Sequence, residues 1–396
     1  MKYKIITFLI LGFSSNSFSN SISEMNLPKW VKGVSFYIEP KSDSNIYQIN
    51  ESILNEELLD PNDGILKTSL GLKTKMLFKP MKKYILINTL KADGVMRYFS
   101  NVSDNFIRDE YSLSNSLVGV IPVSKKWQIG HLLYVGANQS QSFEYRDEDG
   151  SKEINSIEND HLNYSATLFT SFKFNKSWKT SLDLGVNLLD FRQDYSSYTS
   201  VKGEENDSLQ RSAKLNNQFK LGKVAVLDTP LSYSKSFFRN RSALDSTGAF
   251  SFEGIVPRDL IEKISFLPKL TINTPVGSFS TSFGLTNQKD LVFGGRSYDG
   301  TEFSLGYSVN FLNNHNLSFD YSESIHSYLS AGDFFDSSNE LRQDKVSSIA
   351  IDYKLKEIFK SSFDFNLNYT YLDSNNGSFG GSFDSNALSS KLTYNL

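Results

Sequence analysis

Histidine and cysteine are the first residues to consider for catalysis or metal binding. The chain has four histidines, at positions 131, 161, 315 and 326, and no cysteine. No histidine has a second histidine or a carboxylate at metal-ligand spacing, and no G-x-S-x-G, Walker or H-E-x-x-H motif is present. The sequence therefore predicts no catalytic residue, no metal site and no cofactor, and it places the histidines at strand or rim positions.

Charged and amide residues at alternate positions offer a different chemistry. Lys73 and Lys75, for example, oppose the apolar series Leu70, Leu72 and Met76. In an extended chain these polar groups share one face. On the wall of a water-filled channel they would tune which solutes pass, whereas in a closed lumen they would form a ladder of paired charges. The candidates for this lumen-lining role are Lys73, Lys75, Asp183, Asn187, Lys263, Lys269, Asp320, Asp352, Lys354, Asp364 and Lys391.

The elements that position these residues are long alternating strands. Ser361–Tyr371 reads S-S-F-D-F-N-L-N-Y-T-Y, with apolar residues at every second position. This period of two predicts a strand with one apolar and one polar face. The same pattern recurs from about residue 68 to Leu396, with short turns alternating with long polar loops, as is typical of a transmembrane β-barrel.

The pattern predicts about sixteen strands, and fourteen to eighteen are compatible with it. An even number places both termini in the periplasm, with every short turn on one side and every long loop on the other. Two stretches, Arg146–Asp160 and Arg239–Ile261, are expected to be a charged loop and an irregular insertion. The predicted strands are Val31–Glu39, Thr68–Phe78, Tyr84–Met96, Tyr111–Val123, Trp127–Tyr145, His161–Phe174, Trp178–Tyr195, Leu209–Leu221, Asp228–Phe238, Glu262–Asn273, Gly277–Asn287, Thr301–Phe311, His315–Leu329, Asp344–Leu355, Lys360–Leu372 and Asn386–Leu396.

The competing architecture for so many strands is a secreted β-sandwich. Sandwich strands are usually about five or six residues long and show no short–long loop rhythm. The 31 Phe and 20 Tyr residues often fall at strand ends, as aromatic girdles at two lipid interfaces require. We therefore predict an all-β protein that forms a single transmembrane antiparallel up-and-down barrel.

The N-terminus has the features of a secretory signal. Two lysines precede the apolar run Ile5–Phe13, and a Ser-x-Ser box ends at Ser19. The run is too short to span a membrane as a helix. We expect residues 1–19 to be a signal peptide and residues 20–396 to be one barrel domain. A net charge of -3 and the absence of a basic aromatic patch predict no nucleic-acid partner.

These features together resemble bacterial outer-membrane β-barrels of the porin type. The resemblance rests on the signal peptide and on the closing strand Leu388–Leu396, which ends in leucine where such barrels usually end in an aromatic residue. It implies residence in the outer membrane of a Gram-negative bacterium and contact with lipid, lipopolysaccharide and the barrel-assembly machinery. Two short stretches, Ser42–Tyr47 and Tyr371–Asn375, also resemble barrels associated with exopolysaccharide secretion.

The expected function is a porin-like channel, monomeric or a homo-oligomer such as a trimer. It would pass small polar solutes or export a polysaccharide. A non-conducting surface barrel that acts in adhesion or envelope assembly through its outer loops is the first alternative. An enzyme with a rim site built on His131 or His161 is the second.

Overall fold

The fold is described from a computed structural model of the chain. The described residues are 29–43, 65–81, 83–99, 110–139, 141–148, 151–158, 160–191, 207–242, 258–292, 296–312, 314–332, 341–358, 362–375 and 383–395. The predicted signal peptide lies outside these ranges. Within them, no helix is long and apolar enough to cross a bilayer.

Sixteen antiparallel spanning strands form one sheet, which confirms the predicted fold class and strand number. Fifteen of the spans are single elements, and the remaining span consists of β12 and β13. The bounds are β1 Val31–Asp43, β2 Ile65–Met81, β3 Tyr84–Phe99, β4 Glu110–Pro122, β5 Trp127–Gln139, β8 His161–Lys173, β9 Trp178–Phe191, β10 Ser208–Leu221, β11 Ala225–Ser242, β12 Arg258–Phe266, β13 Lys269–Thr274, β14 Gly277–Asp290, β15 Tyr298–Phe311, β16 His315–Gly332, β17 Leu341–Leu355, β18 Phe363–Asn375 and β19 Phe383–Asn395.

The interrupted span departs from the predicted continuous strand Glu262–Asn273. Both halves pair with β11 and with β14, and the pairing register is the same on either side of the break. The break falls at Leu267 and Pro268, because proline has no N–H to donate to the ladder. The two halves therefore act as one membrane crossing, and the alternation of faces continues through it.

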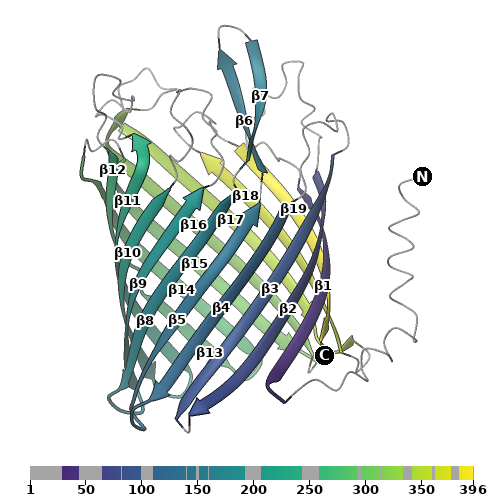
Figure 1. The fold of residues 1–396 in the computed structure, drawn as a ribbon, viewed down its shortest axis with the longest axis vertical. Coiled ribbons are helices and arrows are strands. Elements are labelled where there is room, and N and C mark those ends of the chain that lie inside the picture. Colours follow the sequence, from purple (N-terminus) through teal and green to yellow (C-terminus); the bar gives the residue numbers. More distant parts are fainter. Residues whose placement is uncertain are drawn as a thin grey trace.

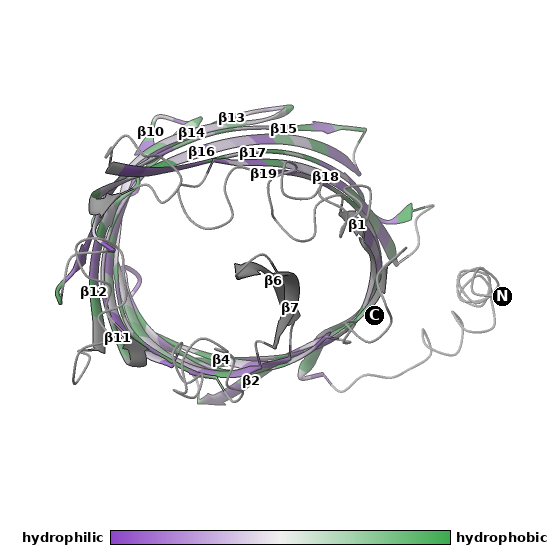
Figure 2. Ribbon diagram, turned by 90° about the horizontal axis from the view of Figure 1, so that it is seen from above, coloured by the Kyte–Doolittle hydropathy of each residue, from purple (hydrophilic) through white to green (hydrophobic). Residues whose placement is uncertain are grey.

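The sheet closes on itself where β1 meets the last strand. β1 pairs with β2 on one side and with β19 on the other, from Ser35 opposite Asn395 to Asp43 opposite Ala387. The strands run obliquely around the wall in Figure 1 and form a ring in the view along the axis in Figure 2. Closure leaves no unpaired sheet edge, which is the condition for a sheet to cross a lipid bilayer.

The two faces of the wall differ in composition and in burial. Directly paired residues on neighbouring strands share a face, so one face can be followed around the ring from the registers. The apolar face is exposed, with Leu184 at 51% and Phe283 at 54%, whereas Ser282 and Thr286 on the polar face are 7% and 5% exposed. Side chains crowd on the concave side of a barrel and spread on its convex side. The apolar face therefore points outward to lipid and the polar face points inward, as in an outer-membrane barrel.

An aromatic girdle surrounds the end with the short turns. Trp178 stacks on Phe174 with ring centroids 4.1 Å apart and on Phe219 at 5.8 Å. Trp30 stacks on Phe78 at 5.7 Å, and Phe363 contacts Tyr394 at 4.8 Å. Aromatic rings collect at the level of the lipid headgroups, so this girdle marks the periplasmic interface when the short turns are periplasmic.

The structure corrects two predicted loops. Residues 141–148 and 151–158 are not part of a spanning strand and a loop, but form the separate hairpin β6–β7, which extends beyond the barrel in Figure 1. The predicted insertion Arg239–Ile261 is shorter, because β11 continues to Ser242 and β12 begins at Arg258. In the first place Phe143 and Tyr145 alternate with polar residues, which extended the predicted strand, and the charged residues that follow favoured a loop.

Candidate functional site on the lumen wall

All eleven predicted lumen-lining residues lie on the inward face. The cross-strand register connects them in one series around the ring, for example from Lys73 through Ser35 and Asn395 on the β2–β1–β19 side. Asp183 and Asn187 face Lys214 and Gln210 on β10. The structure places these side chains but does not test their action on a solute, which stays a prediction.

Several inward charges remain exposed although they lie inside the ring. Lys73, Lys75, Lys269 and Asp320 are all exposed. Lys73 stands directly opposite Lys91 on β3, whose side chain is 46% exposed. Within the described residues neither Lys73 nor Lys75 forms an ion pair. The inner wall at β2 and β3 therefore offers cationic groups to whatever occupies the lumen.

Other inward charges are paired along the wall. Lys354 bonds Asp352 at 2.5 Å, and Lys391 bonds Glu39 at 2.8 Å across the closing seam. Asp364 accepts hydrogen bonds from the backbone N–H of Glu357 at 2.9 Å and from Asn395 at 2.8 Å. Lys263 lies 3.5 Å from the hydroxyl of Tyr298. The predicted set thus divides into paired wall residues and unpaired groups that face the lumen.

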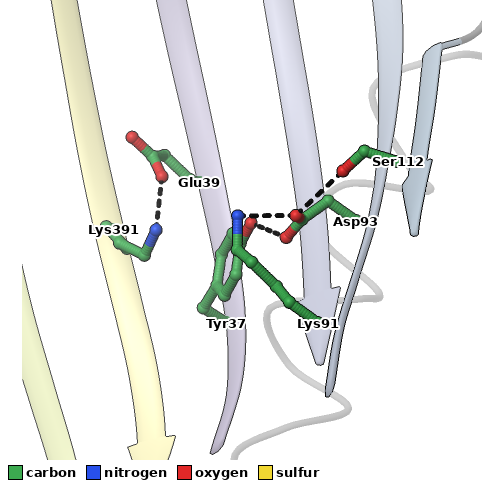
Figure 3. A network of polar contacts seen from close by, with 6 residues as sticks. All are labelled: Tyr37, Glu39, Lys91, Asp93, Ser112 and Lys391. Carbon is green, nitrogen blue, oxygen red and sulfur yellow. Dashed lines mark hydrogen bonds and ion pairs between the residues drawn. The ribbon is translucent and has the colours of Figure 1, made fainter. Parts of the chain in front are cut away.

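A polar network crosses five strands at the closing seam, and it centres on Tyr37 (Figure 3). The Tyr37 hydroxyl donates to Asp93 on β3. Asp93 also bonds Lys91 at 2.6 Å and accepts from Ser112 on β4 at 3.1 Å. Lys391 of β19 places its Nζ 3.5 Å from the centroid of the Tyr37 ring. The network therefore links β19 and β1 to β3 and β4.

Gly71 makes this arrangement possible. Tyr37 lies on β1 and its acceptor lies on β3, so the ring must cross β2. It crosses above Gly71, where the Cβ of any other residue would overlap the ring. A glycine in a strand often marks such a close approach.

A second inward cluster lies near the ends of β15 to β17 that lead into the long loops. The Tyr298 ring, only 7% exposed, stacks on His326 with centroids 4.3 Å apart and contacts Tyr328 at 5.5 Å. The Arg342 guanidinium lies 4.3 Å from the Tyr328 centroid and bonds Asp344 at 2.5 Å. The aromatic rings of the cluster pack against each other, and the cluster therefore stabilises this part of the wall.

The histidines lie apart from one another. His131 faces outward near the Tyr84 hydroxyl at 3.4 Å, and His315 bonds the Tyr353 hydroxyl at 2.7 Å in the aromatic girdle. His161 packs on Phe191 at 5.0 Å. In the part of the chain that the structure describes, no group of three or more His, Asp or Glu side chains could hold a metal ion.

Sequence reasoning missed Tyr37, Asp93 and the Tyr298 cluster. Tyr37 and Asp93 are 56 residues apart and meet only through the strand register. Tyrosine alternates with apolar residues as readily as phenylalanine does, so its inward position carries no signal of its own. The one available signal was Gly71, a glycine within an otherwise alternating strand.

Neither family models nor curated proteins match this chain. Among solved structures, OccAB1 of Acinetobacter baumannii aligns at 12% identity over 94% of this chain and 99% of that chain, with a TM-score of 0.49. OccK8 (OprE) of Pseudomonas aeruginosa aligns at 11% identity over 92% and 98%, with a TM-score of 0.46. A bacterial polysaccharide outer membrane secretin aligns at 8% identity over 92% and 98%, with a TM-score of 0.45. These superpositions are too loose to transfer a function, and the fold rests on the strand pairing of this chain.

Proposed function

We propose that the barrel is a porin-like channel that passes small polar solutes across the outer membrane. The observation that carries the proposal is the set of inward-facing charges that stay exposed, with Lys73, Lys75, Lys269 and Asp320 as its clearest members. A lumen filled by paired side chains would bury such groups. Barrels of about sixteen strands are wide enough to hold an aqueous channel.

The lining favours hydrated solutes. Serine is the commonest inward residue on β11, β14 and β16, as in the series Ser232, Ser234 and Ser236. Hydroxyl groups exchange hydrogen bonds with water and with polyhydroxylated solutes at little cost. The unpaired lysines of β2 add an attraction for anions, which predicts a pore with modest anion preference.

Planar-bilayer recording of the purified protein tests the proposal. We expect discrete conductance steps, and a reversal potential in a KCl gradient that indicates anion preference. The Lys73→Gln/Lys75→Gln variant should shift this potential towards cation preference, with Lys73→Gln alone giving a smaller shift. Lys345→Gln is the matched control, because Lys345 faces outward beside Glu323 at 3.1 Å and should leave selectivity unchanged.

Absence of discrete conductance in correctly folded protein would overturn the channel. The surface role in adhesion or assembly would then become the better hypothesis. Its described structural basis is the hairpin β6–β7, which stands clear of the barrel wall in Figure 1. Adding sugars to the chamber would distinguish the two transport roles. Block of the conductance by an oligosaccharide, but not by the corresponding monosaccharide, would favour polysaccharide export over passage of small solutes.

A further inference from the structure

A row of four charged residues crosses the outer, lipid-facing side of the wall. Arg211 on β10 stands directly opposite Lys235 on β11, Lys235 stands opposite Glu262 on β12, and Glu262 stands opposite Lys289 on β14. We call these four residues the cationic row. They share their face with the exposed apolar residues Leu231, Ile264 and Leu285, so they point away from the lumen.

The cationic row has a charge excess that the described protein does not neutralise. Lys235 bonds Glu262 at 2.9 Å, and the Tyr233 hydroxyl donates to the same carboxylate oxygen at 3.1 Å. Arg211 and Lys289 are exposed, and neither forms an ion pair within the described ranges. The row therefore contains one carboxylate, Glu262, and three cationic side chains, Arg211, Lys235 and Lys289.

Two of the cations are held close together. The Arg211 guanidinium carbon and the Lys235 Nζ lie 5.7 Å and 5.8 Å from the centroid of the same Phe237 ring. Like charges directly opposite on neighbouring strands destabilise a sheet, and a bound anion would reverse that effect. Both cations therefore contact one outward-facing ring on the outer side of the wall.

The position of the row along the barrel identifies the environment. Arg211 lies ten residues from Leu221 at the short-turn end of β10, and Lys289 lies twelve from Gly277 at the same end of β14. Strands that rise about 3.3 Å per residue and tilt by about 40° place the row roughly 25–30 Å above the short turns. The apolar band of such barrels is about 25 Å tall, so the row meets the outer-leaflet headgroups.

Simple solvation of a rim does not explain the row, because apolar residues lie on both sides of it. Tyr233 and Ile264 lie below, and Phe237 and Leu291, 37% and 43% exposed, lie above. The other outward charges at this level lie on β9, next to β10, and on β15 to β19. They are mainly acidic, as Asp190 on β9 shows, and Glu323 is bonded to Lys345. The cation excess is thus confined to one sector.

We propose that the cationic row binds the phosphate of a lipid headgroup in the outer leaflet. Arg211 and Lys235 would hold the phosphate oxygens and Lys289 would add charge, while the apolar residues below contact the acyl chains. Arginine forms paired hydrogen bonds with phosphate, which suits it to this site. The proposal does not depend on whether the lumen conducts.

The test measures lipid binding by the folded, full-length barrel in detergent, using native mass spectrometry. The probes are bisphosphorylated lipid A, the same lipid without phosphates, and inorganic phosphate. We expect wild-type protein to retain phosphorylated lipid A, and Arg211→Gln/Lys289→Gln to bind it at least about tenfold more weakly, the factor expected for one charge-assisted hydrogen bond. Lipid A without phosphates should bind the wild-type protein as weakly as phosphorylated lipid A binds the double variant. Inorganic phosphate should not displace phosphorylated lipid A from the wild-type protein.

Lys345→Gln is the matched control, since it removes one outward cation elsewhere on the wall and should leave binding unchanged. Equal binding by wild type and the double variant, or equal loss in the control, would overturn the proposal. So would indifference to the lipid phosphates, or displacement by inorganic phosphate, which would indicate a free-anion site. If the double variant does not fold, the salt dependence of wild-type binding provides the test. Raising NaCl from about 0.05 M to about 0.5 M should weaken binding of phosphorylated lipid A, because salt screens the charges. Unchanged binding would refute the site.

Discussion

Replacing Gly71 by alanine should destabilise the barrel, although alanine normally stabilises a strand relative to glycine. The new methyl group would occupy the space of the Tyr37 ring and would lie 2.5 Å from an Asp93 carboxylate oxygen. The ring must then move off β2. It loses its hydrogen bond to Asp93 and its contact with Lys391 together.

The magnitude follows from these two losses. A hydrogen bond to a charged group contributes about 1.5–3 kcal/mol. A cation–π contact at a partly exposed site contributes about 0.5–1 kcal/mol, and the Lys391 side chain is 31% exposed. Alanine recovers about 0.5–1 kcal/mol of backbone entropy relative to glycine. We therefore expect Gly71→Ala to lower the free energy of unfolding by about 1–3.5 kcal/mol.

The assay is urea unfolding of the refolded barrel in lipid, followed by tryptophan fluorescence. A double-mutant cycle isolates the cause, because Tyr37→Ala removes the ring that the methyl group meets. In that background Gly71→Ala should be neutral or stabilising by up to about 1 kcal/mol. Equal destabilisation with and without Tyr37 would refute the reasoning, since the loss would then arise elsewhere in β2.

Three further predictions concern other parts of the wall. Leu184→Lys on the outward face should cost about 2–4 kcal/mol in the same unfolding assay, whereas Asn187→Lys on the inward face of the same strand should cost under about 1 kcal/mol; the reverse order would contradict the assignment of faces. Ser282→Ala should cost about 1 kcal/mol, because it removes a hydroxyl that is 7% exposed and bonds Ser304 at 2.6 Å; no change in the urea midpoint would count against this bond. Arg342→Lys should destabilise the Tyr298 cluster by about 1–2 kcal/mol, because lysine cannot both bond Asp344 through two nitrogens and stack on Tyr328; stability equal to wild type would show that the fork geometry is unimportant.

The sequence predicted the architecture because alternation is a direct record of the two faces of a strand. The predicted number of strands was correct even though Pro268 interrupts one of them. The proline breaks the hydrogen-bond ladder without changing which residues face outward. Strand ends were less predictable. β15 begins at Tyr298 and β16 continues to Gly332, beyond the predicted Thr301 and Leu329. Tyr298 faces inward and Asp299 outward, which reverses the alternation, and residues 330–332 are the small residues Ser, Ala and Gly.

The inward face was predictable in composition but not in its contacts. Parity alone places Lys391 and Lys73 on the same side, yet only the register gives Lys391 a carboxylate partner on β1 and leaves Lys73 opposite another lysine. A shift of the closing seam by two residues would preserve every face and change every partner across that seam. Which inward charges are paired and which are not therefore depends on information that alternation does not contain.

The cationic row shows that alternation is also an incomplete guide to the outward face. Alternation predicts that charges avoid the lipid face, because a charge there costs about 2–4 kcal/mol at the bilayer midplane. That cost falls to about 0–1 kcal/mol near the interface, so the rule applies only when the height of a residue is known. Glu262 and Lys289 lie at alternate positions on the outward face, and the proposed headgroup level is where the cost of such charges is small. Under the proposal made above, the outward charges of the cationic row mark a level at which β10 to β14 meet the polar part of the lipid.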